Sequence, residues 1–116
     1  MSSRHHRRDN ALKLRASVFA ALGDETRLAV LAKLCQGEPQ SIARLTAGTR
    51  LTRQAVTKHL RVLETAGVVR SMRVGRESLF EIEPQPLEEA RNYLDQVSRQ
   101  WDDALARLKA HVEDLG

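Results

Sequence analysis

Apolar and polar residues recur with helical spacing over residues 51–67, and this stretch organises our interpretation of the chain. Val56, Leu60 and Leu63 fall on one side of a helix and form a narrow apolar stripe. Thr52 precedes the stripe, and its hydroxyl can accept a hydrogen bond from the first helical turn. Gly67 follows it and suits the left-handed backbone that ends many helices. The pattern predicts a helix between Thr52 and Gly67 with one buried side.

The opposite side of this predicted helix is polar and basic, with no acid before Glu64. Guanidinium, ammonium, amide and hydroxyl groups there suit DNA phosphates and base edges; they belong to Arg53, Gln54, Thr57, Lys58 and Arg61. We interpret the segment as a helix that reads DNA. A solvated surface helix is the alternative that this segment alone leaves open.

Two helices and a short third one are expected before it. The first covers residues 11–22, and its predicted buried side consists of Leu12, Leu14, Val18, Phe19 and Leu22. Asp24 caps a second helix that runs to about Cys35. Ser41 caps the short third helix, and a turn over residues 47–50 leads into the basic helix. A short helix, a tight turn and a basic helix have the spacing of a helix-turn-helix motif.

The spacing of apolar residues changes from helical to strand-like after Gly67. Residues 68–74 and 77–83 are rich in β-branched residues or alternate in polarity, and Gly75 and Arg76 lie between them. Two strands about a glycine-containing tip predict a hairpin. Arg70, Arg73 and Arg76 make this hairpin basic toward its tip.

A long last helix is expected from about Leu87 to Asp114. Apolar residues recur along it in a seven-residue register: Leu87, Ala90, Leu94, Val97, Trp101, Ala104, Leu108, His111 and Leu115, widened by Leu105 and Val112. Such a stripe is long for so small a domain, so part of it is expected to pack on the domain and part on a second copy of the chain. Packing within one chain is the alternative.

Composition and charge narrow the classes of function. A length of 116 residues indicates one domain, and the aromatic content of 3% argues against base stacking on single-stranded nucleic acid. The net charge of +4 favours an anionic partner. Residues 41–78 hold eight Arg or Lys and two acids, whereas residues 84–116 hold four bases and seven acids. The positive charge is therefore concentrated on the predicted helix-turn-helix and hairpin.

Other chemistries find little support in the sequence. The single cysteine, Cys35, excludes an intrachain disulfide and suggests a reducing compartment. There is no membrane-length apolar run and no signal-peptide core, so we expect a cytoplasmic protein with no membrane partner. No nucleophile–base pair, carboxylate pair or phosphate-binding glycine loop is apparent, so we expect no enzymatic activity, catalytic residue or cofactor.

Four segments together resemble the ArsR-type winged-helix transcriptional repressors. They are residues 19–28 (FAALGDETRL), 51–60 (LTRQAVTKHL), 63–69 (LETAGVV) and 73–77 (RVGRE), within a resemblance that spans about residues 16–83. The resemblance implies a mainly α fold with a small β-hairpin, namely a winged helix-turn-helix of five helices with a two-stranded wing. We accordingly expect a disordered basic arm over residues 1–10, the DNA-binding domain over 11–83 and a C-terminal dimerisation helix over 84–116.

The resemblance also implies a mode of action. The protein would be a homodimer that binds a partly palindromic operator in double-stranded DNA and releases it on an unknown signal. By position, Gln54, Thr57 and Lys58 would contact bases or backbone, Arg53 and Arg61 phosphates, and Arg73 and Arg76 the flanking groove or backbone. His59, close to the apolar stripe, is expected to be a partly buried structural residue. The first and last helices would form the dimer interface through Leu12, Phe19, Leu94, Val97, Trp101, Leu105 and Leu108.

The sequence also departs from the family. Many members bind metals through a cysteine pair at the start of the third helix, and residues 39–45 contain no cysteine. A second type of metal site in the family uses Asp and His ligands of the last helix. This chain matches only the second half of that site, at His111 and Asp114, so we expect no metal site. A buried, unreactive Cys35 is expected. A metal- or redox-responsive repressor using His111 or Cys35, and a winged-helix module that binds another protein, remain the alternatives.

Overall fold

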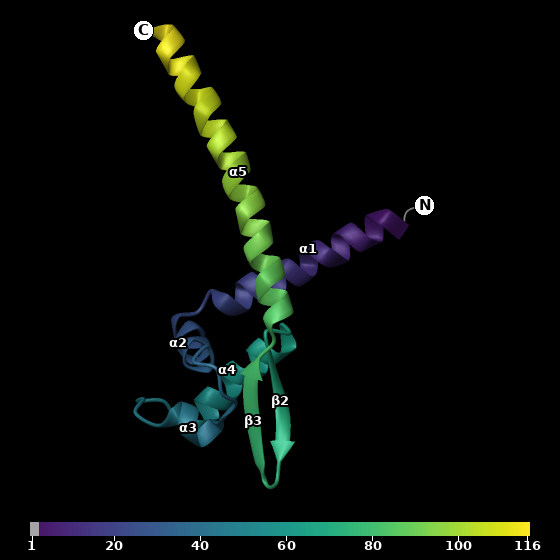
Figure 1. Cartoon of the computed structure of the whole chain (residues 1–116), viewed down its shortest axis with the longest axis vertical. Helices are drawn as coiled ribbons and strands as arrows, with labels where there is room; N and C mark the ends of the chain where they lie inside the picture. The colour runs from purple at the N-terminus through teal and green to yellow at the C-terminus, as the bar shows by residue number, and fades with distance from the viewer. Residues whose placement is uncertain (1–2) are drawn as a thin grey trace.

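The computed structural model describes the backbone of residues 3–116 and the side chains of residues 10–116. Within this range the chain forms α1 (Ser3–Leu22), α2 (Glu25–Leu34), β1 (Gln40–Ser41), α3 (Ile42–Thr46), α4 (Arg53–Thr65), β2 (Val69–Val74), β3 (Glu77–Ile82) and α5 (Pro84–Leu115). Helices α2, α3 and α4 and the sheet make a compact body, from which α1 and α5 extend in different directions (Figure 1). The overall extents are 67 × 43 × 22 Å.

The mainly helical fold with five helices in residues 3–116 is confirmed, but two helix boundaries differ from the prediction. The first helix begins at Ser3, so the expectation of a disordered arm is wrong for residues 3–10; Met1 and Ser2 lie outside the described residues. The segment 3–10 contains no Gly or Pro to interrupt a helix that continues into residues 11–22. The last helix begins at Pro84, because proline is tolerated in a first helical turn.

The sheet has a third strand that the hydrophobic pattern did not reveal. The order is β1-β3-β2, with all neighbours antiparallel, and Gln40 pairs with Phe80 of β3. The sequence did not predict this third strand, because two residues are too few to show a strand period. The wing itself is confirmed: Val74 pairs with Glu77 across a two-residue turn.

The core lies between the inner sides of α2, α3 and α4, one face of the sheet and the ends of α1 and α5 that meet the body. Val56, Leu60 and Leu63 of α4 are fully buried there, as their spacing predicted. The C-terminus of α4 closes with Gly67 at φ +83°. The amide of Val68 donates to the carbonyl oxygen of Leu63, and that of Gly67 donates to Glu64. This is the Schellman arrangement, which favours glycine at the left-handed position.

Among the described side chains of α1, the buried ones lie toward its C-terminus. Val18 and Ala21 are buried, whereas Leu12 and Leu14 are exposed. The predicted buried side is therefore wrong at Leu12 and Leu14; Leu14 lines an open cleft between α1, α4 and α5 instead of entering the core.

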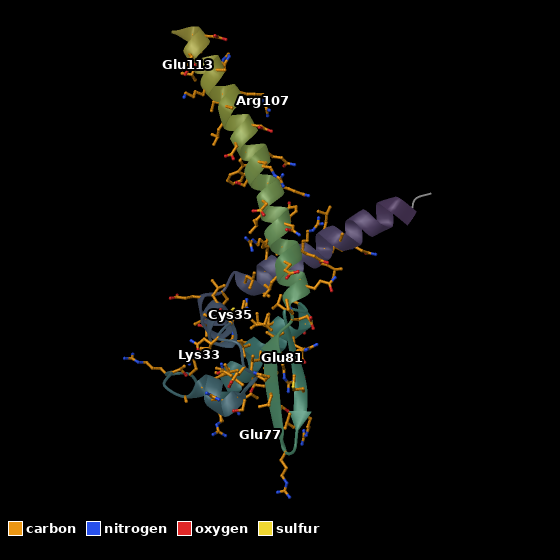
Figure 2. The ribbon with its side chains drawn as sticks, in the orientation of Figure 1. Lys33, Cys35, Glu77, Glu81, Arg107 and Glu113 are labelled. Atoms are coloured by element: carbon orange, nitrogen blue, oxygen red, sulfur yellow. The ribbon has the colours of Figure 1, made fainter. Side chains whose placement is uncertain are left out.

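Helix α5 extends far beyond the body. Its buried residue is Ala90, and every side chain from Ser98 to Gly116 is exposed. Figure 2 shows Arg107 and Glu113 on this projecting half, remote from the sheet that carries Glu77 and Glu81. The stripe of Leu94, Trp101, Leu105, Leu108, Val112 and Leu115 is consequently exposed in the isolated chain. No helix among the described residues has the length and apolarity needed to cross a membrane.

Candidate nucleic-acid interface

Helix α4 presents its basic side to solvent because its ends and its apolar side are fixed. The hydroxyl of Thr52 accepts a hydrogen bond from the amide of Ala55 at 3.0 Å, which caps the first turn as predicted. Burial of the stripe on the body then turns the opposite side outward. The outward side carries exposed Arg53, Gln54, Lys58 and Arg61 and half-buried Thr57, and these five residues line one shallow, open depression.

The hydroxyl of Thr57 also donates to the carbonyl oxygen of Arg53 at 2.7 Å. Its hydrogen is therefore occupied within the helix, while its oxygen can still accept a hydrogen bond. The structure thus brings together all five residues that the sequence assigned to this helix.

Contacts outside α4 fix the helix-turn-helix geometry. The ammonium group of Lys33, on α2, donates to the carbonyl oxygens of Leu45 at 3.1 Å and Ala47 at 3.4 Å, where α3 ends. The hydroxyl of Thr49 donates to Thr46 and accepts from the amide of Leu51. A cation at a helix C-terminus also complements the helix dipole. Sequence reasoning missed Lys33, since its partners lie twelve and fourteen residues away.

His59 and Asp24 connect α4 to the start of α2. The Nδ1 atom of His59 lies 3.9 Å from the carboxylate of Asp24, and the ring is half-buried, as expected of a structural residue. Asp24 accepts a hydrogen bond from the amide of Arg27 at 2.9 Å. This hydrogen bond, more than the nearby charges of Arg27 and His59, lowers the pKa of Asp24. The carboxylate is therefore ionised at neutral pH and caps α2.

The three arginines of the wing differ in their surroundings. The guanidinium of Arg70 lies 2.7 Å from the carboxylate of Glu81 and 3.4 Å from that of Glu83. The hydrogen bond to Glu81 is the main reason why the pKa of Arg70 is raised. Arg73 on β2 and Arg76 in the turn are exposed, and neither forms an ion pair with any side chain of residues 10–116. These two arginines are thus the ones available to an external anion.

The wing is also joined directly to α4. The hydroxyl of Ser71 donates to the carboxylate of Glu64 at 2.7 Å. Because Glu64 is in the last turn of α4 and Ser71 is on β2, this contact helps to hold Arg73 and Arg76 on the body that carries the basic side of α4.

The predicted dimer residues do not form one uniform surface in the single chain. Leu12, Leu94, Trp101, Leu105 and Leu108 are exposed, whereas Val97 and Phe19 are half-buried. The ring of Phe19 packs at 5.9 Å from that of Tyr93 of the same chain. Phe19 therefore already has an aromatic partner on α5 of the same chain.

Cys35 differs from the expectation. The prediction of a buried thiol is wrong: Cys35 is exposed because it is the residue that follows the last turn of α2 (Figure 2). Among the side chains of residues 10–116, no three His, Cys, Asp or Glu residues come together as a group that could hold a metal ion. His5 and His6 lie outside the described side chains.

An exposed basic helix in a helix-turn-helix motif, flanked by a basic hairpin, defines the class of winged helix-turn-helix DNA-binding proteins. A family model described as a helix-turn-helix domain matches residues 14–71. The chain is 35% identical over 98 residues to the HTH-type transcriptional regulator Rv2034 of Mycobacterium tuberculosis. The aligned region covers 84% of this chain and 88% of that protein.

Solved structures give the same result. The ArsR-like transcriptional regulator of Rhodococcus sp. RHA1 is 37% identical, with a TM-score of 0.75 over 86% of this chain and 93% of that one. The Mycobacterium bovis domain Mb0332, described as a homodimeric winged helix-turn-helix, shows the same fold at 24% identity, with a TM-score of 0.66 over 90% of this chain and 94% of that one. The chain belongs to the ArsR-type winged helix-turn-helix transcriptional regulators, and it is a DNA-binding regulator of transcription.

Proposed function

We propose that this regulator is a homodimeric repressor that occupies a partly palindromic operator and leaves it when an effector binds. The observation that carries the proposal is the exposed basic side of α4, held outward by the fully buried Val56, Leu60 and Leu63. We infer further that the protein acts in the cytoplasm, by binding and without catalysis.

Base reading is assigned to α4, because the major groove of B-DNA accommodates an α-helix. Gln54, Thr57 and Lys58 contact bases or adjacent backbone, and Arg53 and Arg61 contact phosphates. Arg73 and Arg76 of the wing contact the flanking groove or backbone. In a dimer the two α4 helices meet major grooves about one helical turn apart, near ~34 Å, or a multiple of that distance.

Dimerisation is assigned to α1 and α5. The projecting half of α5 leaves an apolar stripe from Leu94 to Leu115 exposed in the isolated chain. Contiguous apolar surface of this kind is uncommon on a soluble monomer and marks an interaction site. A second copy of the chain presents the same stripe, and Mb0332, which has the same fold, is described as homodimeric.

The test is fluorescence anisotropy of a labelled duplex from the region upstream of the coding sequence, compared with a scrambled duplex of equal length. If each protomer neutralises about four phosphates, the slope of log affinity against log salt is near −7 at ~0.9 per phosphate. Preference for the native duplex with such a slope supports the proposal. No binding at low salt would contradict it and favour a module whose α5 binds another protein.

The wing is tested by Arg76→Ala. We expect this variant to bind every duplex more weakly and to flatten the salt slope by nearly two units, about one per protomer, since each arginine loses one phosphate contact. Arg70→Ala is the matched control: Arg70 is already paired with Glu81 and Glu83, so its removal should leave the slope unchanged. A slope unaltered by Arg76→Ala would remove the wing from the interface.

The dimer interface is tested by Trp101→Ala. Trp101 is 68% exposed in the chain, so its truncation leaves the fold intact and removes surface that a second copy would bury. We expect the dimer dissociation constant to rise at least ~30-fold, because tryptophan anchors in interfaces typically contribute about 2 kcal/mol or more. Sedimentation at a series of protein concentrations measures it. Asp103→Ala, two residues along the same exposed helix, should have no comparable effect; a dimer equally stable with and without Trp101 would place the interface elsewhere.

A further inference from the structure

A cleft outside the DNA-facing surface lies where α1, the end of α4 and the start of α5 meet. It has a volume of about 520 Å³, within the ~300–1,000 Å³ range of small-molecule sites. Leu14 and Val18 of α1 and Pro86 and Ala90 of α5 provide apolar walls, and residues 65–67 close one side. The cleft can hold a small molecule with an apolar body.

Arg15 gives this cleft a positively charged group. Its guanidinium lies 5.2 Å from the centre of the Tyr93 ring of α5, in a cation–π contact beside the cleft. Among the described side chains it takes part in no ion pair within 4 Å, although Glu89 lines the same cleft. A guanidinium without a carboxylate partner suits a carboxylate, which it can bind through two parallel hydrogen bonds.

Glu89 limits where such a ligand can place its charge. Its carboxylate is exposed and accepts a hydrogen bond from the side chain of Gln85, one turn earlier, at 3.4 Å. A ligand carboxylate is attracted by Arg15 and repelled by Glu89, so it lies on the Arg15 side of the cleft. The rest of the ligand then packs against the apolar walls.

We propose that this cleft is a binding site for small amphipathic carboxylic acids, with the carboxylate on Arg15 and the apolar body against Leu14, Val18 and Ala90. The site is separate from the basic side of α4.

The location of the cleft gives the ligand a means to affect DNA binding, and this consequence rests on the proposed repressor function. Residues 65–67 are the hydrogen-bonded end of α4, and Pro86 lies in the first turn of α5. At ~100° per residue, Leu12 and Phe19 lie on average about a quarter turn around α1 from the cleft residues, and about 40–60° from Arg15. A bound acid therefore contacts the end of the reading helix and the base of the dimerisation helix.

The test is a titration of the full chain with phenylbutyrate, followed by amide chemical shifts in NMR spectra. We expect shifts confined to residues 11–18, 65–67 and 86–90, with a dissociation constant on the order of 0.1–1 mM for so small a ligand. Arg15→Gln should weaken binding about tenfold or more, since a charge-assisted hydrogen bond is lost. Glu89→Gln should strengthen it about two- to fivefold, because the repelling charge is removed.

Two controls isolate the carboxylate contact. Lys13→Gln removes an exposed positive charge two residues from Arg15 and should leave the affinity unchanged. Phenylbutanol, the neutral analogue, should bind at least about tenfold more weakly than phenylbutyrate. Equal binding by the Arg15→Gln variant, equal binding of the alcohol, or shifts located elsewhere would overturn the proposed site.

A parallel measurement separates this inference from the proposed function. Operator binding by Arg15→Gln without phenylbutyrate should equal that of the parent chain, and saturating phenylbutyrate should change the operator affinity of the parent chain alone. Cleft binding without any DNA binding would overturn the repressor function and leave the site intact. Normal DNA binding with no shifts in the cleft would overturn the site alone, and shifts without a change in operator affinity would overturn its regulatory role.

Discussion

Leu60→Ala is expected to lower the free energy of unfolding by about 3 kcal/mol, within the ~2–5 kcal/mol range for fully buried leucines. Leu60 has no exposed surface and lies between Val56 and Leu63 in the stripe that holds α4 on the body. The truncation removes apolar contacts and leaves a cavity that the surrounding helices only partly fill. Urea denaturation followed by circular dichroism, at one fixed protomer concentration, measures the loss.

Leu28→Ala is the matched control for this prediction. It deletes the same atoms from a helical leucine that is 49% exposed, so the lost burial and the cavity are both smaller. We expect a loss of about 1 kcal/mol or less at this site. Equal losses for the two variants would show that the stripe of α4 does not hold the helix in the way the structure indicates.

Gln54→Ala is expected to cost specificity for the operator while the fold stays unchanged. Gln54 is exposed in the first turn of α4, and alanine favours helix at least as strongly as glutamine. A lost pair of hydrogen bonds to a base costs about 1–3 kcal/mol in each half-site. A symmetric dimer therefore loses at least about 30-fold in affinity for the operator, with a much smaller change on a scrambled duplex.

The contrast between the two duplexes is the decisive quantity for Gln54. Gln96→Ala removes an exposed amide from α5, remote from the basic side of α4, and should change neither affinity. If Gln54→Ala weakened the operator and the scrambled duplex by the same factor, Gln54 would be a backbone contact and base reading would rest on Thr57 and Lys58.

Local signals in the sequence were sufficient for α4 and for the wing. A cap at Thr52, a stop at Gly67 and three apolar residues at helical spacing specify one helix with one buried side, whatever the rest of the chain does. The basic side follows from the same periodicity, so the spacing alone places Arg53, Gln54, Lys58 and Arg61 on the surface. Gly75 between two alternating segments specified the hairpin in the same way.

The start of α1 and the short strand β1 show where local signals end. Residues 3–10 have no apolar period, and a polar helix that continues an adjacent helix leaves no such mark. Gln40 and Ser41 become a strand only because β3, about forty residues later, offers a free edge. Neither could be predicted, because each depends on a neighbouring element.

The properties of individual charged residues were decided by the tertiary structure. Arg70, Arg73 and Arg76 look alike in sequence, yet Arg70 is paired with Glu81 and Glu83 across the sheet while the other two stay exposed. Lys33 supports the turn before α4 through carbonyl groups of α3, and Arg15 lines a cleft between three helices. By itself the sequence determined the main helices, the hairpin and the side of α4 that faces outward, because periodicity and caps act over a few residues. Only the tertiary structure decided which charges are paired and which are available to a ligand, because that depends on residues brought together from distant parts of the chain.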